Sequence, residues 1–249
     1  MKFTFLTTDD PIYLPAFYDR VLGTRGGSTA AVYVVPPLYK KQTPADAALR
    51  YAKTFGWNAA GHLAARVVGA RLRRDSVQAA CRRHGVRCEE IADVNAPEFL
   101  DQLRREAADV LISVSCPQIY KKPLIELSPQ GILNIHGAIL PLYRGVMPSF
   151  WMMANGEAQA GVTVYFVDER IDSGERVGQR IFDILPGETL DAFIRRSKAI
   201  AADLLLEVLD GLEQGVLDRH VLDLKAGSYF SWPDPEAVKR FRATGRKLW

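Results

Sequence analysis

The sequence lacks the glycine-rich loop that opens most nucleotide-binding α/β folds. Its first apolar segment, Phe3 to Thr7, runs directly into Thr8-Asp9-Asp10 instead of G-x-G-x-x-G. Gly23 to Gly27 is rich in glycine, but it follows a predicted helix, whereas the dinucleotide motif must follow a strand. The sequence therefore disfavours a site for NAD or ATP.

Cysteine is also scarce, with only Cys81, Cys88 and Cys116 among 249 residues. An odd count without metal-type spacing argues against a disulfide framework and against a zinc site. We therefore expect a protein from a reducing compartment, with no bound metal.

Long apolar runs and strong net charge are missing as well. No run approaches the roughly 20 apolar residues of a membrane span, and the run Met1 to Leu6 is too short for a signal peptide. The formal net charge of +3 is too mild to indicate a nucleic-acid partner for the whole molecule. These features favour a cytoplasmic location. The basic cluster near the C-terminus fits either a solvated helix or a contact to phosphate or a partner chain; it comprises Lys239, Arg240, Arg242, Arg246 and Lys247.

Strand-like and helix-like segments alternate along the first half of the chain. Strands are predicted over 3–7, 29–35, 87–92 and 109–115 from their β-branched and apolar content. Helices are predicted between them, over 11–22, 45–74, 76–84 and 96–107, with Gly56 and Gly61 expected to break the second. This alternation predicts an α/β fold with a Rossmann-like, mostly parallel sheet and helices on both faces.

The pattern changes after Gly131. Two alternating runs, 161–168 and 176–184, could pair as a hairpin, and 190–212 reads as a long amphipathic helix that covers the sheet. We expect residues 1–212 to form a catalytic domain and 213–249 to form a short appendage rich in aromatic and basic side chains.

The most informative segment is Asn134-Ile135-His136, near the end of a predicted strand over 131–137. Side chains two residues apart in a strand point to the same face, so Asn134 and His136 are expected to project together. The carboxyl ends of such strands are where α/β folds place their chemistry.

Several motifs around this segment resemble the formyltransferases that use 10-formyltetrahydrofolate. They occur in that family's order and spacing over about 110–179: Leu133-Asn134-Ile135-His136, Leu140-Pro141, Tyr143-Arg144-Gly145, Asn155-Gly156-Glu157, Gly161-Val162-Thr163 and Ile171-Asp172-Ser173-Gly174. The family includes methionyl-tRNA formyltransferase, glycinamide ribonucleotide transformylase and the sugar N-formyltransferases. The resemblance implies a formyltransferase fold and 10-formyltetrahydrofolate as co-substrate.

The resemblance also implies roles for individual residues. The three catalytic residues of the family fall on Asn134, His136 and Asp172. Asn134 and protonated His136 can donate to an oxygen that gains negative charge, and Asp172 can hold and charge the imidazole. The folate would be bound by Gln118, Ile119, Tyr120, Leu140, Val167, Asp168 and Glu169.

The acceptor is less clear from the sequence. Only about 37 residues follow the long helix, which is too few for the C-terminal barrel of the tRNA enzyme. We therefore expect a primary amine on a small metabolite, with a nucleotide-linked amino sugar as the leading class and a homodimer expected by resemblance. The alternatives are 10-formyltetrahydrofolate hydrolysis, a methionyl-tRNA-type enzyme without the C-terminal domain, and a binding protein for folate or nucleotide sugars that has no activity.

Overall fold

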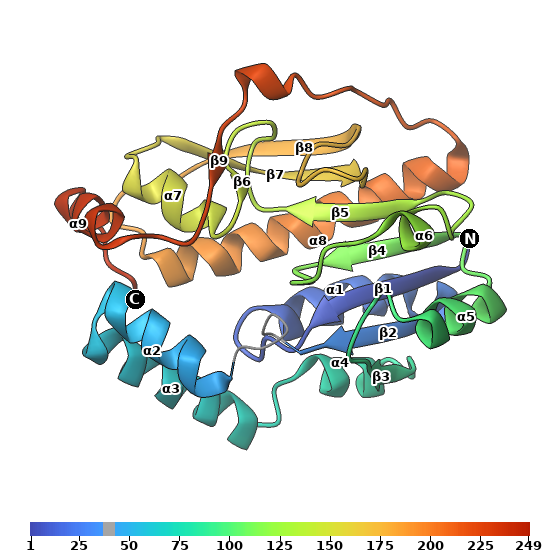
Figure 1. Cartoon of the computed structure of the whole chain (residues 1–249), viewed down its shortest axis with the longest axis horizontal. Helices are drawn as coiled ribbons and strands as arrows, with labels where there is room; N and C mark the ends of the chain where they lie inside the picture. The colour runs from blue at the N-terminus through green and yellow to red at the C-terminus, as the bar shows by residue number, and fades with distance from the viewer. Residues whose placement is uncertain (37–42) are drawn as a thin grey trace.

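A seven-stranded sheet forms the centre of the structure (Figure 1). The computed structural model describes residues 1–36 and 43–249. The strands are β1 (Phe3–Thr8), β2 (Thr29–Val35), β3 (Cys88–Glu90), β4 (Val110–Val114), β5 (Ile132–His136), β7 (Gln159–Phe166) and β8 (Arg176–Asp183), with β6 (Arg144–Gly145) and β9 (Tyr229–Phe230) forming a separate pair. The α-helices are α1 (Leu14–Arg25), α2 (Pro44–Phe55), α3 (Trp57–Leu72), α4 (Val77–Arg83), α5 (Pro97–Glu106), α6 (Lys122–Ile125), α7 (Pro148–Ala154), α8 (Leu190–Gln214) and α9 (Pro235–Ala243).

The sheet is mostly parallel, as the sequence predicts. Its strand order is β3-β2-β1-β4-β5-β7-β8. Strands β1 to β5 are parallel, whereas β7 runs antiparallel to β5 and to β8. The predicted hairpin of β7 and β8 is therefore confirmed. The chain moves outward from β1 in one direction and from β4 in the other, which makes the gap between these strands a topological switch point.

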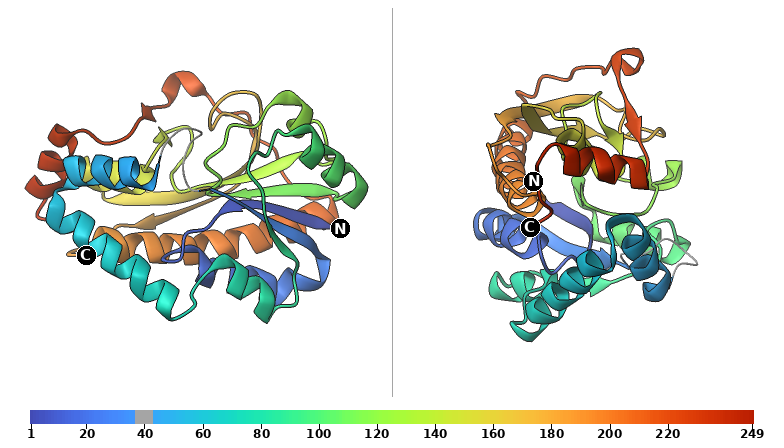
Figure 2. Two further views of the ribbon diagram at one scale, coloured as in Figure 1. Left: turned by 60° about the horizontal axis from the view of Figure 1, so that its bottom comes forward. Right: turned by 90° about the vertical axis from the view of Figure 1, so that its left-hand side faces the viewer.

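Helices cover both faces of the sheet because the strands are apolar on both sides. Phe3 and Phe5 of β1 face a core that contains Phe17 of α1 and Leu205 of α8. Leu6 faces the opposite core, where α5 and α6 pack. Burial of each of these large apolar side chains stabilises the folded state by about 1.5–3 kcal/mol. The long helix α8 runs along one face of the sheet, as predicted (Figure 2).

A third apolar cluster joins distant parts of the chain at one end of the sheet. The ring of Phe150 in α7 lies 5.5 Å from that of Phe55 in α2 and 5.3 Å from that of Phe241 in α9. All three side chains are at most 2% exposed. The C-terminal helix α9 is thereby packed in one cluster with α2 and α7.

Two local predictions were wrong. Helix α1 begins at Leu14 and not at Pro11, because Asp10 Oδ1 accepts the N–H groups of Ile12 and Tyr13 in a turn that precedes the helix. Only Gly56 separates α2 from α3, with a φ of 99° that favours glycine. Gly61 lies inside α3, where its propensity cost of about 1 kcal/mol does not end the helix.

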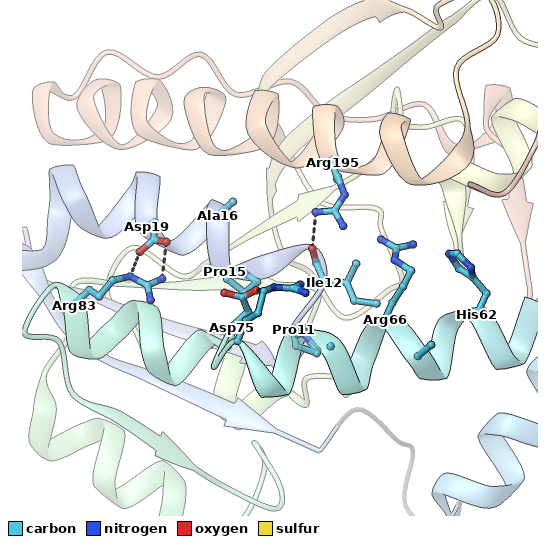
Figure 3. A pocket seen from close by; sticks show the side chains of 14 residues that line it. Pro11, Ile12, Pro15, Ala16, Asp19, His62, Arg66, Asp75, Arg83 and Arg195 are labelled. Carbon is cyan, nitrogen blue, oxygen red and sulfur yellow. Dashed lines mark hydrogen bonds and ion pairs between the residues drawn. The ribbon is translucent and has the colours of Figure 1, made fainter.

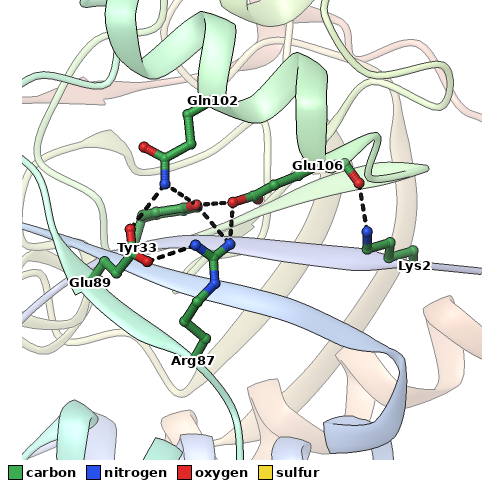
Figure 4. Close-up of polar contacts among 6 residues, drawn as sticks. All are labelled: Lys2, Tyr33, Arg87, Glu89, Gln102 and Glu106. Atoms are coloured by element: carbon green, nitrogen blue, oxygen red, sulfur yellow. Dashed lines mark hydrogen bonds and ion pairs between the residues drawn. The ribbon is translucent and has the colours of Figure 1, made fainter.

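A polar network fixes the edge strand β3 to the rest of the sheet (Figure 4). Arg87 Nη2 and Gln102 Nε2 both donate to the Tyr33 hydroxyl, at 3.0 and 2.8 Å. Glu89 accepts from the same two side chains, and Glu106 accepts from Tyr33 and Arg87. Each side chain in the network has at least one partner, although Glu106 Oε2 is buried without one among the described residues, and we interpret the network as structural.

Candidate active site

Strand β5 brings Asn134 and His136 to one cavity at its carboxyl end. The cavity has a volume of about 350 Å³, and Asp172 also lines it. The His136 side chain is 8% exposed and that of Asp172 is 12% exposed. The prediction that Asn134 and His136 project together is thus confirmed, and the structure adds the predicted carboxylate to them.

The hydrogen bond of His136 defines which ring nitrogen carries the proton. Its Nε2 lies 2.8 Å from the carbonyl oxygen of Tyr143. A carbonyl only accepts hydrogen bonds, so Nε2 is the protonated nitrogen of the neutral ring. The other nitrogen, Nδ1, lies 3.7 Å from Asp172 Oδ2. Nδ1 is therefore the nitrogen that faces the carboxylate.

Asp172 is held by two further donors. Its Oδ2 accepts the N–H of Gly145 at 2.7 Å, and its Oδ1 accepts the hydroxyl of Tyr165 at 2.8 Å. Asp172 has a φ of 49°, in the left-handed region that Asp tolerates better than most residues. At Gly145, a Cβ atom would lie 2.2 Å from the carbonyl oxygen of Phe230, so only glycine fits this close approach. These contacts fix the orientation of the carboxylate.

Tyr165 is a site residue that the sequence analysis missed. Asn134 Nδ2 donates to its hydroxyl at 2.8 Å, and that hydroxyl donates to Asp172. Burial, together with the charge of Asp172, raises the pKa of Tyr165 well above its usual value. Tyr165 therefore stays protonated and links the amide to the carboxylate. No motif in the sequence indicates this role, because Tyr165 reaches the site only through the pairing of β7 with β5, which places it beside Asn134.

A second cavity of about 220 Å³ adjoins the first and shares Asn134, Asp172 and Gly145 with it. Six of the seven residues predicted to bind folate line this cavity: Gln118, Ile119, Tyr120, Val167, Asp168 and Glu169. Their role in binding stays a prediction.

The side chains along one wall of this cavity differ in what they offer a ligand. Ile119 is 66% exposed. The Gln118 amide is held at both ends, since it accepts the Val94 N–H and donates to the Ala92 carbonyl, each at 2.8 Å. Tyr120 donates to Ser113 Oγ at 2.6 Å. Gln118 and Tyr120 thus shape the wall, whereas Ile119 presents free apolar surface.

Leu140 lies apart from these six residues. It is 2% exposed and packs in a small cluster with Tyr165 and Leu222, and it is absent from the walls of both cavities. The structure therefore places Leu140 behind Tyr165, where it supports that ring.

Lys198 is a second site residue that the sequence analysis missed. It projects from α8 into the catalytic cavity, and its Nζ donates to Ser115 Oγ at 2.7 Å. Burial lowers the pKa of the Lys198 ammonium, although the charge of Asp10 acts in the opposite direction. A single lysine in an amphipathic helix does not stand out in the sequence, so its place in the site could not be predicted.

A larger cavity, of about 630 Å³, lies between α1, α3 and α8 (Figure 3). Its charged side chains all have ion-pair partners: Arg83 pairs with Asp19 at 2.6 Å and Arg73 with Asp75 at 3.0 Å. Arg66 and Arg195 both pair with Asp191 of α8, which lies outside the cavity wall. None of the three predicted catalytic residues lines it. We therefore place the chemistry in the cavity of His136 and not in this one.

Comparison with known proteins agrees with this geometry. A family model described as formyl transferase matches residues 61–209, which is more than half of the chain. The chain belongs to the formyl transferase family. Within the part of the chain that the structure describes, no helix combines the length and apolar character needed to cross a membrane.

Relatives by sequence include two methionyl-tRNA formyltransferases. That of Trichlorobacter lovleyi is 35% identical over 191 residues, which cover 73% of this chain and 60% of the relative. That of Ruminiclostridium cellulolyticum is 31% identical, over 65% of this chain and 52% of the relative. The chain thus spans less than two thirds of the length of these relatives.

Solved structures show the same fold in other members of the family. Glycinamide ribonucleotide transformylase 1 from Symbiobacterium toebii has a TM-score of 0.61 and 19% identity, with 90% of this chain and 94% of that chain covered. An N-formyltransferase from Helicobacter canadensis, in complex with folinic acid and dTDP-3-aminofucose, has a TM-score of 0.62 and 17% identity, with 98% and 80% covered.

Proposed function

We propose that the protein transfers the formyl group of 10-formyltetrahydrofolate to a primary amine of a small metabolite, with nucleotide-linked amino sugars as the acceptor class. The observation that carries this proposal is the convergence of Asn134, His136 and Asp172 in one cavity, beside a second cavity that shares two of them. Membership of the formyl transferase family supports the reaction type.

The second cavity fits a folate co-substrate in its chemistry. Ile119 and Val167 contribute apolar surface to it, and the exposed ring of Tyr229, which can stack on a planar group, also lines it. The co-substrate supplies an activated formyl carbon. Because Asn134 and Asp172 belong to both cavities, a group bound in the second cavity can present that carbon to the first.

The catalytic residues have complementary tasks in this reaction. One N–H of the Asn134 amide is used by Tyr165, which leaves the other to donate to the formyl oxygen as that oxygen gains negative charge. His136 can donate to the same oxygen from Nδ1 in its imidazolium form, and Asp172 Oδ2 lies 3.7 Å from that nitrogen, where it orients the ring. Asp172 can also accept, directly or through a water, the proton that the attacking amine releases.

Tyr229 belongs to the segment 213–249, so this predicted appendage contributes to the binding surface. We propose that residues 1–212 carry the catalytic groups and that 213–249 help to bind the substrate. The homodimer and the cytoplasmic location stay predictions.

A second candidate is formylation of an aminoacyl-tRNA. The identity of 35% to a methionyl-tRNA formyltransferase favours it. In this case the amine belongs to the amino acid and the catalytic groups act in the same way, so the two candidates differ only in the acceptor.

An acceptor panel tests the proposal. The purified protein is incubated with 10-formyltetrahydrofolate and with amino-sugar nucleotides, simple amino sugars or aminoacyl-tRNA, while tetrahydrofolate release is followed by absorbance and the product by mass. Release that depends on an amino-sugar nucleotide, with the mass gain of one formyl group, supports the proposal. Release without any amine indicates a hydrolase, and release only with aminoacyl-tRNA supports the second candidate. Folate binding without any release indicates a binding protein.

A further inference from the structure

Helix α3 carries an exposed apolar stripe along its outer side. Of its 16 residues, only Ala59 and Ala70 are buried. At 3.6 residues per turn, the side opposite these two alanines spans about 100° of the helix surface. We call the exposed residues on that side the α3 stripe: Trp57, Gly61, Ala64, Ala65, Val68 and Leu72.

The α3 stripe is too apolar for an ordinary solvated face. Trp57 is 72% exposed, Val68 is 56% exposed and Leu72 is 80% exposed. Figures 1 and 2 show α3 at the margin of the molecule. A continuous apolar surface on the outside of a helix indicates an interaction site, because a helix that is apolar on all sides is normally covered on all sides.

The inner side of α3 is already engaged. The ring of His62 stacks on that of Trp249 at 4.3 Å, and Arg66 forms an ion pair with Asp191 of α8. Figure 3 shows both side chains pointing from α3 towards α8. These contacts hold the helix in one orientation, with the α3 stripe turned outward.

Gly61 indicates that the α3 stripe is shaped for a close neighbour. A Cβ atom at this position would meet no other atom within 4 Å, so packing inside the chain does not require glycine. Glycine in a helix interior is less favourable than alanine. A second helix that approaches closely explains this choice, since glycine is the residue that lets another backbone come near.

The α3 stripe is complementary to itself when two copies of the helix pack antiparallel. A two-fold axis between Ala64 and Ala65 places Trp57 of one copy against Leu72 of the other, and Val68 against Gly61. The large residues at the ends then meet, and each valine fits the gap above a glycine. A parallel pair would instead put Val68 against Val68 and leave the two glycines facing each other.

The polar groups at the border also fit the antiparallel arrangement. Arg71 of one copy faces Asn58 of the other, next to the ring of Trp57. The guanidinium thus meets an amide and an aromatic face, with which it can interact favourably, and no second cation. The C-terminal end of each helix also lies beside the N-terminal end of the other, where the helix dipoles attract.

The area of the α3 stripe suits a weak but specific dimer. The helix is about 24 Å long. Contact along the stripe would cover roughly 500–600 Å² of each copy, or about 1,000–1,200 Å² in total, which reaches the lower end of specific interfaces. We propose that a second copy of this chain docks on the α3 stripe, so that two copies form an antiparallel pair of α3 helices about a two-fold axis. This inference concerns assembly and does not depend on the acceptor.

Sedimentation velocity of the whole protein over a range of concentrations tests the inference. We expect a reversible equilibrium between monomer and dimer, with a dissociation constant of about 1–100 μM, as befits a small interface. Val68→Glu places a carboxylate in each half of the contact, and it should weaken association about 100-fold or more.

Gly61→Gln separates the dimer from the fold of the single chain. In the single chain glutamine has open space and a better helix propensity than glycine, so the urea midpoint at low concentration should stay or rise. In the dimer the new side chain fills the gap that accommodates Val68, so association should weaken about 10-fold or more. Val221→Gln is the matched control, because it changes an 83% exposed valine outside α3 and should leave association unchanged.

Cross-linking reports the orientation of the two helices. Ala64→Cys lies next to the axis, so a short bismaleimide should join the two copies. In an antiparallel pair the two copies of Asn58 lie about 20 Å apart along the helices, so Asn58→Cys should not be joined. The wild type, with its three native cysteines, gives the background.

The outcomes decide between this interface and other occupants. A protein that is still monomeric at about 100 μM, or a dimer that both Val68→Glu and Gly61→Gln leave intact, overturns the inference. Cross-linking at position 58 as readily as at 64 overturns the antiparallel arrangement. A monomer that binds phosphatidylglycerol vesicles through the α3 stripe also overturns it, because the occupant is then a membrane surface. None of these results depends on whether an amine is formylated.

Discussion

The hydroxyl of Tyr165 offers a specific test of how the site is held together. It joins Asn134 Nδ2 to Asp172 Oδ1 through two hydrogen bonds of 2.8 Å. Tyr165 itself is only 3% exposed. Tyr165→Phe removes both bonds and keeps the ring. One bond is between neutral groups and the other is to a carboxylate, so we expect a loss of about 2–4 kcal/mol in the free energy of unfolding.

The effect on activity has a different origin. Without the hydroxyl, Asp172 keeps only the hydrogen bond from the Gly145 N–H among the described residues, and the Asn134 side chain loses its hydrogen bond to Tyr165. Misplacement of catalytic groups by about 1 Å can reduce rates about 100-fold, so we expect kcat/KM to fall about 10- to 100-fold. The assay combines urea unfolding with steady-state formyl transfer.

Tyr143 provides a matched control on the same protein. Its hydroxyl also accepts from an asparagine, Asn155 Nδ2 at 3.1 Å, and also donates to a carboxylate, that of Glu157. Its contact with His136 is made by the main-chain carbonyl, which Tyr143→Phe leaves in place. We expect a similar loss of stability but little loss of activity. Equal losses of activity in the two variants, or full activity in Tyr165→Phe, would refute the reasoning.

Three further predictions follow from the same geometry. His136→Ala and Asp172→Asn should each lower turnover at least about 100-fold while folate affinity, measured by fluorescence titration, changes little; full turnover in either variant would exclude the proposed roles. Gly145→Ala should lower the free energy of unfolding by about 3 kcal/mol or more, because its Cβ would lie 2.2 Å from a carbonyl oxygen, whereas Gly156→Ala should cost only about 1 kcal/mol, since its φ is 73° and the space is open. Equal costs in urea unfolding would contradict this comparison. Burial raises the pKa of Asp191, but hydrogen bonds from the facing arginine and tyrosine side chains outweigh it and hold the pKa below its usual value. The contribution of the Asp191 carboxylate to the free energy of unfolding should therefore be complete above its pKa in the unfolded chain, about 3.9. It should vanish as the pH falls through its lower pKa in the folded protein. The difference in unfolding free energy between wild type and Asp191→Asn should shrink accordingly in acid, and a difference that grows in acid would reverse the assigned sign.

The sheet was predictable because its strands carry strong local signals. Val110 to Val114 is a largely apolar run, and the strand of Asn134 and His136 begins with the apolar pair Ile132-Leu133 after Gly131. The predicted helices between the strands indicated the parallel arrangement. Local signals were weaker at the start of α1, where the Asp10 side chain bonds with a turn ahead of the helix. They also failed at Gly61, since the helix-favouring alanine and leucine residues on both sides of it outweigh the propensity of one residue.

The site was predictable only where a motif carried it. Asn134, His136 and Asp172 stand in motifs that resemble a known family, and the structure brings them into one cavity. Tyr165 and Lys198 stand in no such motif. Tyr165 reaches the site through strand register, and Lys198 through the packing of α8 along the face of the sheet. Neither relation can be read from spacing along the chain.

The most direct test of the central claim follows the formyl carbon itself. The protein is given 10-formyltetrahydrofolate with a ¹³C-labelled formyl group and an acceptor amine, and the label is located by NMR. We predict that it appears in a formamide on the acceptor, and that His136→Ala, with folate still bound, forms this product at least about 100-fold more slowly. Label released by the wild type only as free formate, or formamide formed equally fast by the variant, would contradict the account.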